Sequence, residues 1–157
     1  MKKPKVYIAM PCYDTMKVET CVSLLNTYAV LAKSGVECIF KSVKSSLVTH
    51  ARNLLTAGFM ASDYDYMLCV DADIEFEPTA VLRMLVPEKD IVVTPYRLKE
   101  NPLKTSYPVD HLDPDNIKIL PFDLVELKSA PAGLMLINRA VFRTLMARYP
   151  QKKIKFN

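Results

Sequence analysis

Residues 66–73 read Tyr-Met-Leu-Cys-Val-Asp-Ala-Asp, and this stretch decides the fold. A short apolar run followed directly by carboxylates is typical of a buried strand in a parallel sheet. In α/β folds, ligands bind beyond the carboxyl ends of such strands. The stretch therefore predicts a strand over residues 66–70 with a binding site after it, although the Asp-x-Asp tripeptide alone fits a turn or a helix cap about as well.

The residues before this stretch alternate expected strands with expected helices. Residues 6–10 are apolar and stop at Pro11, which predicts a first strand, and residues 36–40 predict a second. Between them, residues 18–33 repeat apolar side chains at the spacing of an amphipathic helix and stop at a Ser-Gly pair. A second helix is expected after N-caps at Ser45-Ser46. Its buried stripe would comprise Leu47, Ala51, Leu54, Leu55 and Phe59.

The residues after the stretch continue the alternation. Pro78 fits the first turn of a helix, and residues 91–94 predict a fourth strand. Residues 97–121 contain four prolines without clear periodicity and predict a long loop. Strands over residues 122–127 and 133–137 would precede a helix from Asn138, with an inner face of Val141, Leu145, Met146 and Tyr149. We therefore predict an α/β fold with a mixed, largely parallel sheet and flanking helices.

The composition indicates one folding unit with a mild positive charge. The 157 residues, half of them apolar, are enough for one substantial core, so a single domain over residues 1–157 is expected. The 21 lysines and arginines against 17 aspartates and glutamates give a net charge of +4, which argues against a nucleic-acid binder and suits an anionic small-molecule substrate. A basic cluster near the end allows at most peripheral membrane contact, through Lys152, Lys153 and Lys155.

The cysteines form neither a metal-binding nor a disulfide pattern. Cys12, Cys21, Cys38 and Cys69 lie in or beside apolar runs and show no Cys-x-x-Cys pairing. We expect them to be reduced core residues, which makes a cytoplasmic location the default. The apolar stretch behind the basic N-terminus is too short for an export signal, and no run approaches the roughly 18 residues of a transmembrane helix.

Three polar clusters fall where an α/β sheet places its binding crevice, namely residues 11–14, Arg52-Asn53 and residues 71–73. Asp71 and Asp73 are two residues apart, so in extended backbone their carboxylates share a side and can approach one cation. Magnesium or manganese suits carboxylate and phosphate oxygens better than zinc does. Such an ion commonly bridges protein carboxylates to a diphosphate.

Tyr13, Asp14 and Arg52 each fit two roles. An aromatic face and a carboxylate could bind a nucleobase and its ribose, or Asp14 could cap the following helix while Tyr13 packs over the sheet edge. For Arg52, a solvated helix face is the simpler interpretation. A functional arginine would instead turn toward the acidic residues or a phosphate, where its planar fork makes paired bonds.

The rest of the sequence offers fewer candidates for chemistry. His50 and His111 are the only histidines and neither has a spaced partner, although His111 in the long loop could close over a substrate. The only glycines are Gly35, Gly58 and Gly133, which excludes the Walker and dinucleotide-binding fingerprints. A Gly-x-Ser-x-Gly nucleophile elbow is also absent from the sequence.

Taken in order, these residues resemble nucleotide-sugar-dependent glycosyltransferases of the GT-A fold, in particular the family-2-like enzymes. Residues 6–14 look like that family's first strand and nucleotide loop, and Ala51-Arg52-Asn53 resembles its Ala-Arg-Asn helix. Residues 66–73 match its strand ending in Asp-x-Asp. Residues 132–142 resemble the later strand and helix that border the sugar site. The four stretches occur in the family's order, which is more specific than any one of them.

The resemblance implies a role for each matching residue. Asp71 would hold ribose or water around the ion, and Asp73 would ligate the metal directly. Ala132 and Gly133 would lie close to the transferred sugar. The implied cofactor is Mn²⁺ or Mg²⁺, and the implied partners are a UDP- or GDP-sugar and a glycan, lipid or protein acceptor. The nucleoside and its diphosphate would contact Pro11, Tyr13, Asp14 and Arg52.

The chain departs from the family after Arg139, where it has no Asp, Glu or His. The family usually has an acidic pair there, which supplies the general base for the acceptor, and often a later histidine on the metal. Either the chain is a fragment or a short member, or Asp110, His111, Asp113 or Asp115 substitutes, or the donor is bound without efficient transfer. The leading hypothesis is a metal-dependent hexosyltransferase, against a nucleotidyltransferase or a non-catalytic nucleotide- and metal-binding module.

Overall fold

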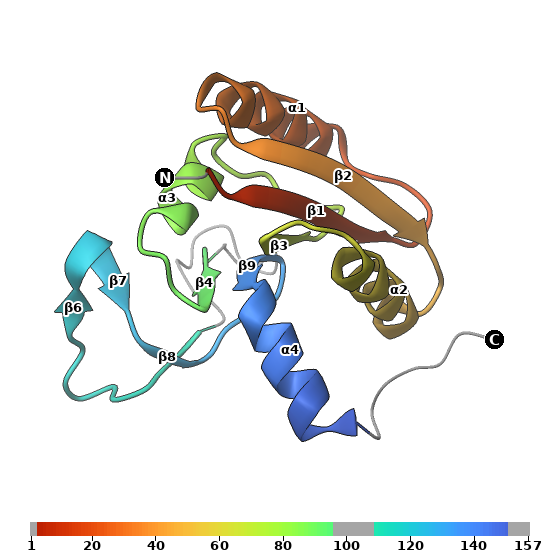
Figure 1. Cartoon of the computed structure of the whole chain (residues 1–157). Helices are drawn as coiled ribbons and strands as arrows, with labels where there is room; N and C mark the ends of the chain where they lie inside the picture. The colour runs from red at the N-terminus through yellow and green to blue at the C-terminus, as the bar shows by residue number, and fades with distance from the viewer. Residues whose placement is uncertain (1–2, 96–108, 151–157) are drawn as a thin grey trace.

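The centre of the structure is a five-stranded mixed sheet in the order β2-β1-β3-β9-β4 (Figure 1). It is seen in a computed structural model that describes residues 3–95 and 109–150. β1 pairs in parallel with β2 and β3, whereas β9 runs antiparallel between β3 and β4. The prediction of a mixed, largely parallel α/β sheet is therefore confirmed. The strands are β1 (Lys5–Cys12), β2 (Glu37–Lys44), β3 (Tyr66–Val70), β4 (Ile91–Val93) and β9 (Leu134–Asn138).

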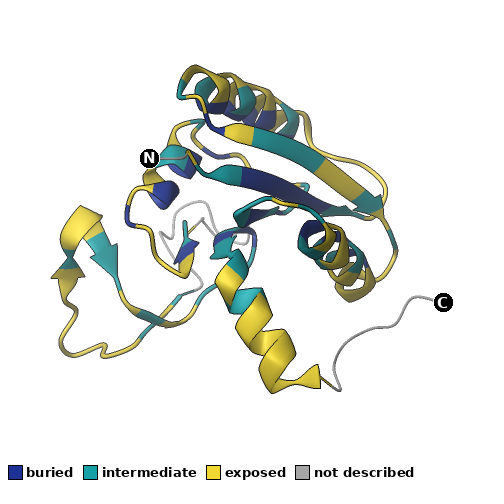
Figure 2. Ribbon diagram, viewed as in Figure 1, coloured by how far each residue is buried: buried dark blue, intermediate teal, exposed yellow. Residues whose placement is uncertain are grey.

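Helices cover both faces of this sheet. α1 (Val18–Lys33) and α3 (Ala80–Leu85) pack on one face, and α2 (Val48–Ala61) and α4 (Arg139–Arg148) lie on the other. Side chains of β1 alternate between the two layers because successive residues of a strand point to opposite faces. Figure 2 shows the buried residues along β1 and on the helix sides that face the sheet. Val6, Ile8 and Met10 belong to the first layer, and Tyr7 and Ala9 to the second.

The first two strands are longer than predicted, whereas β3 has the predicted bounds. β1 continues through Pro11 to Cys12, so the predicted stop at Pro11 is wrong. The reason is that β3 pairs with β1 only as far as Ala9, which leaves Pro11 with a single neighbouring strand and no need for an N–H on the other side. β2 begins at Glu37 and extends to Lys44, which pairs in register with Cys12.

The bounds of α1 are as predicted, but its predicted apolar stripe largely faces outward. Leu24 and Leu31 face the core instead, together with three small polar residues, two of which bind the segment after β3. The Thr20 hydroxyl donates to the Ala72 carbonyl at 3.2 Å, and the Ser23 hydroxyl accepts from the Phe76 N–H at 3.1 Å. The exposed members of the stripe include Val18, Val22 and Leu25.

α2 begins at Val48, so neither of the predicted caps, Ser45 and Ser46, is its N-cap. Leu47 is the N-cap, 65% exposed, and no side chain caps the helix. The Ser45 hydroxyl instead accepts a hydrogen bond from the Leu47 N–H at 3.1 Å, which makes a local turn. The rest of the predicted stripe is confirmed at Ala51, Leu55 and Phe59, all buried, with Leu54 half-buried.

Residues 109–129 form two small ribbons rather than a plain loop. β5 (Asp110–His111) pairs with β8 (Leu127–Ser129), and β6 (Ile119–Leu120) pairs with β7 (Leu124–Val125). The predicted long loop is therefore wrong over this part, and residues 97–108 of it lie outside the described residues. The single strand predicted over 122–127 is also wrong, because Phe122 and Asp123 adopt positive φ values of 67° and 56° and reverse the chain.

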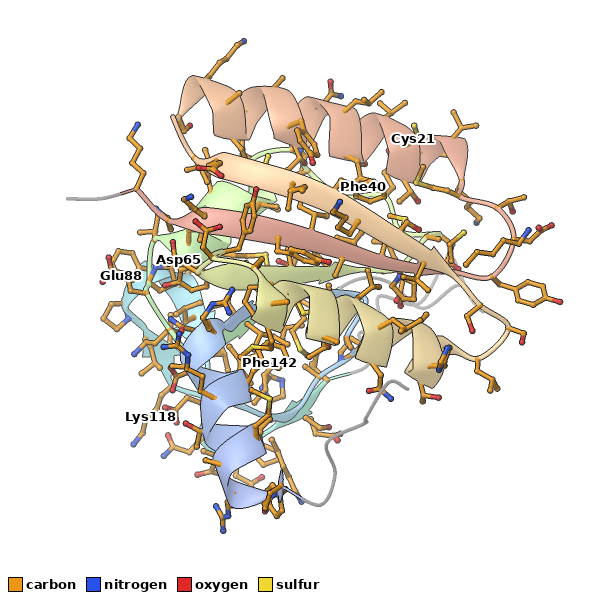
Figure 3. The ribbon with its side chains drawn as sticks, turned by 45° about the vertical axis from the view of Figure 1, so that its right-hand side comes forward. Cys21, Phe40, Asp65, Glu88, Lys118 and Phe142 are labelled. Carbon is orange, nitrogen blue, oxygen red and sulfur yellow. The ribbon has the colours of Figure 1, made fainter. Side chains whose placement is uncertain are left out.

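α4 begins after Asn138, whose side chain accepts a hydrogen bond from the Ala140 N–H at 2.8 Å. Its predicted inner face is wrong at Leu145, Met146 and Tyr149, which are exposed, whereas Val141 is half-buried. The helix instead packs through Phe142, whose ring lies 5.5 Å from that of Phe59 on α2 (Figure 3). Among the described residues, we find no helix whose length and apolar character would allow it to cross a membrane.

Candidate functional site

The predicted site residues gather at one edge of the central sheet. β1, β2 and β3 run in parallel, so Cys12, Lys44 and Val70 end at this edge, and the antiparallel β9 starts there with Leu134. Residues that follow the parallel strands therefore lie beside the residue that precedes β9, which is Gly133. This is the edge where open α/β sheets bind ligands.

Arg52 turns from α2 toward the acidic stretch. Its Nη2 lies 2.9 Å from Asp71 Oδ1, and both side chains are about one-third exposed, at 36% and 32%. The alternative of a purely solvated helix face is therefore wrong for Arg52. Its Nε is buried without a hydrogen-bond partner in the described part of the chain. Since a guanidinium has five N–H donors, most of its capacity is still available beside Asp71.

The backbone holds Asp71 against the predicted sugar-proximal residues. The Asp71 N–H donates to the Gly133 carbonyl at 2.9 Å, continuing the β3–β9 ladder by one step. Gly133 is buried and Ala132 is half-buried. Residues more than 60 positions apart in the sequence thus meet at a hydrogen bond. Asp71 is therefore in contact with both Arg52 and Gly133.

The turn between the two aspartates is fixed at Ala72. Its carbonyl accepts from the Lys17 N–H at 2.9 Å, as well as from Thr20. Asp71 is half-buried and Asp73 is exposed. The donor set is two carboxylates on one short turn, which fits a hard cation that takes oxygen ligands. No group of three or more His, Cys, Asp or Glu side chains within residues 3–95 and 109–150 could hold a metal ion.

The loop after β1 contains an ion pair that the sequence did not indicate. Lys44 Nζ lies 2.6 Å from Asp14 Oδ1, with both side chains largely exposed. The register of β1 and β2 causes this, because Cys12 and Lys44 are opposite each other at the ends of their strands. Tyr13 is 73% exposed, so its ring does not pack over the sheet edge as one alternative required. Pro11 is half-buried within β1.

Cys69 lies next to this site but is not a reactive thiol. Burial raises its pKa to about 11, an effect that the negative charge of Asp71 reinforces and the positive charge of Arg52 opposes. A thiol with such a pKa is almost fully protonated near neutral pH, and the thiolate is the nucleophile. Cys69 is therefore not a nucleophile at this edge near neutral pH.

The two weak candidates for a general base lie on β5. The Ser129 hydroxyl donates to Asp110 Oδ2, and Ser129 precedes Gly133 by only four residues. His111, the next residue, lines a separate cavity of about 230 Å³ among residues 111–126. Both residues pair with β8, Asp110 opposite Ser129 and His111 opposite Leu127. His50 is exposed on α2.

Comparisons with known proteins support the fold. No protein-family model and no curated protein matches the sequence. A crystal structure of A197 from STIV aligns with a TM-score of 0.54 and 20% identity, over 89% of this chain and 67% of that chain. At this identity, the likeness shows a shared fold alone.

Two further structures align more loosely. One is 4-diphosphocytidyl-2C-methyl-D-erythritol synthase from Anaerococcus prevotii, with a TM-score of 0.46 and 10% identity over 99% of this chain and 80% of that chain. The other is a glycosyltransferase involved in glycosylation of the major capsid of PBCV-1, with a TM-score of 0.48 and 9% identity over 98% and 71%. With TM-scores under 0.5, these two likenesses add no weight to an assignment.

Proposed function

We propose that this chain is a metal-dependent glycosyltransferase that moves a hexose from a nucleoside diphosphate sugar to a hydroxyl of a glycan, lipid or protein. The observation that carries the proposal is the double contact of Asp71, with Arg52 on one side and Gly133 on the other, at the ligand-binding edge of the sheet. A carboxylate, a guanidinium and a residue without a side chain are what a metal-bound diphosphate and an adjoining sugar ring require.

The acidic turn would hold Mn²⁺ or Mg²⁺ through Asp73 and Asp71. Ions of this kind are commonly held by one or two carboxylates together with substrate phosphates, so two protein ligands are sufficient. When bound, the ion would offset negative charge on the departing nucleoside diphosphate. Arg52 would donate to the same diphosphate from beside Asp71, and its bond to Asp71 keeps the guanidinium in place.

The nucleoside would lie over the loop after β1. The exposed ring of Tyr13 offers a face for the base, Pro11 borders it, and Asp14 accepts hydrogen bonds from base or ribose. Asp14 is paired with Lys44, but exposed ion pairs contribute only about 0–1 kcal/mol, so a nucleoside can replace this contact at little cost.

Asp110 is the better candidate for the acceptor's general base. An inverting transfer needs a base near the attacking hydroxyl. The Ser129 hydroxyl donates to the Asp110 carboxylate, and Ser129 precedes Gly133, where the sugar would lie, by four residues. His111 lines the neighbouring cavity instead.

The test is a thermal-shift titration with UDP, GDP and their sugars, with and without Mn²⁺. We expect one nucleotide series to raise the Tm only when the metal is present, because ligand binding to the native state stabilises it. If no nucleotide stabilises the protein with metal, the transferase proposal fails. If nucleotide binds but no sugar is released or transferred from any donor, the chain is a binding module. A nucleotidyltransferase would release pyrophosphate from a nucleoside triphosphate instead.

A further inference from the structure

A cavity of about 230 Å³ lies in the two small ribbons, and its lining includes His111 of β5, Leu120 of β6 and Val125 of β7 (Figure 1). Its lining residues all fall between positions 111 and 126, so it is distinct from the proposed donor site around Asp71. Figure 3 labels one of them, Lys118, on this outer part of the molecule.

Four of the polar side chains that line the cavity do not contribute to holding the fold together. Asp113, Asn116, Lys118 and Glu126 make no side-chain hydrogen bond or ion pair within residues 3–95 and 109–150. Asp110, one residue before the cavity, contrasts with them because Ser129 holds its carboxylate. His111 also lines the cavity, and its buried Nδ1 has no hydrogen-bond partner among the described residues, so five polar side chains are available for hydrogen bonds to a ligand.

The charges of these groups disfavour an anion. Asp113 and Glu126 outnumber Lys118, which gives this set a formal charge of −1, so a phosphate or carboxylate would meet net repulsion. Carboxylates accept hydrogen bonds, whereas ammonium donates and an amide does both. A ligand group that both donates and accepts matches this mixture, and the hydroxyl is such a group.

The cavity also has an apolar side. Leu112 and Ile117 line it and remain 60% and 49% exposed, so part of their apolar surface is still in contact with water. A sugar ring presents an apolar C–H face and a rim of hydroxyls, which corresponds to this division. The volume is below the 300–1,000 Å³ of drug-sized sites and suits one ring.

We propose that this cavity is a second binding site, for a neutral saccharide unit. The inference stands on the cavity and does not require transfer. If the proposed function is correct, the site would hold a remote sugar of a glycan acceptor while the reacting end lies near Gly133.

The test is an NMR titration of the ¹⁵N-labelled protein with methyl glucopyranoside, methyl mannopyranoside and methyl galactopyranoside, without nucleotide or metal. We expect at least one glycoside to cause saturable shifts confined to amides of residues 111–126. Asn116→Ala and Glu126→Gln should each weaken binding about tenfold, as loss of one hydrogen bond does. Asp115→Asn is the matched control, because Asp115 belongs to the same loop but does not line the cavity.

Three results would overturn the inference: no saturable shift with any glycoside, equal weakening by the control variant, or saturation by sodium phosphate or putrescine but not by glycosides. The spectra also show whether each variant is folded. A nucleotide titration of Asn116→Ala separates the two proposals, because this variant should keep the nucleotide-induced rise in Tm while its glycoside binding is weakened. If wild-type protein binds glycoside but no nucleotide, only the donor proposal fails, and if it binds nucleotide but no glycoside, only this one does.

Discussion

The bond between Arg52 and Asp71 joins the two residues that the proposed function uses most. The pair is about one-third exposed, so its contribution to stability is small, about 1 kcal/mol or less. Its role is therefore positional, since it aims a guanidinium and a carboxylate at the same point. Loss of either partner should affect ligand binding more than folding.

Asp71→Asn and Asp73→Asn test the metal role directly. Each should abolish the Mn²⁺-dependent rise in Tm with nucleotide while leaving the Tm of the free protein nearly unchanged, because an amide is a much poorer ligand for a hard cation. Glu75→Gln is the control, since Glu75 is an exposed acidic residue of the same segment. Full nucleotide stabilisation of both aspartate variants would contradict the assignment.

The raised pKa of Cys69 gives a second residue-scale prediction. Alkylation by iodoacetamide should be slow at neutral pH and should speed up as the pH approaches about 11, because only the thiolate reacts. Mass spectrometry of the native protein would measure this for each cysteine. Cys12, near the end of β1, is the internal comparison, and faster labelling of Cys69 than of Cys12 at neutral pH would refute the prediction.

At the scale of elements, α2 and α4 are joined by the side chain of Arg139. Its guanidinium donates to the carbonyls of Tyr64 at 2.6 Å, Phe59 at 2.9 Å and Met60 at 3.3 Å. It also lies 4.3 Å over the Phe59 ring. Burial lowers its pKa, but an arginine stays charged. The first residue of α4 thus binds backbone carbonyls at and just beyond the end of α2.

Arg139→Ala should lower the free energy of unfolding by about 2–4 kcal/mol, because it removes charge-assisted bonds to three backbone carbonyls, of which only that of Phe59 keeps hydrogen bonds from Ser62. Arg139→Lys should recover only part of this, since an ammonium lacks the planar fork. Arg143→Ala, on the exposed side of the same helix, serves as the control. Urea denaturation measures all three, and equal stability of Arg139→Ala and the control would refute this role.

The buried side of α1, which differs from the predicted apolar stripe, gives another prediction. Ser23→Ala leaves the buried Phe76 N–H without its acceptor and should cost about 1–3 kcal/mol. Val22→Ala removes apolar atoms that are half-exposed and should cost less than 1 kcal/mol. A comparison of the two unfolding midpoints distinguishes the observed face from the one that apolar spacing suggests. A larger loss for Val22→Ala would contradict the structure.

The sequence predicted an element correctly where burial follows the local pattern of apolar residues. This holds for the bounds of β3 and of α1. It misplaced faces where a polar residue is buried for the sake of a distant backbone group, as at Thr20 and Ser23. Hydrophobic spacing cannot show this, because the Ala72 carbonyl is 52 positions away from Thr20. In the site, the acidic turn was predicted from its own residues, whereas Lys44 depended on a strand register that no local signal reveals.

At the scale of the whole molecule, strand order determines which backbone is best protected. β1, β3 and β9 have neighbours on both sides, whereas β2 and β4 are edge strands and the ribbons of residues 110–129 lie outside the sheet. Native-state hydrogen exchange should therefore be slowest in β1 and β3 and fastest in β5 to β8. Slower exchange in the ribbons than in β1 would contradict this arrangement.

The position of β9 has a consequence for synthesis. During synthesis the N-terminal part of a chain emerges from the ribosome first. β2, β1 and β3 can pair early, but one edge of β3 stays open and β4 has no partner until residues 134–138 appear. Open strand edges template aggregation. A nascent chain from which β4 has emerged but β9 has not would therefore carry both an unpaired strand and an exposed edge, and we expect it to need a chaperone.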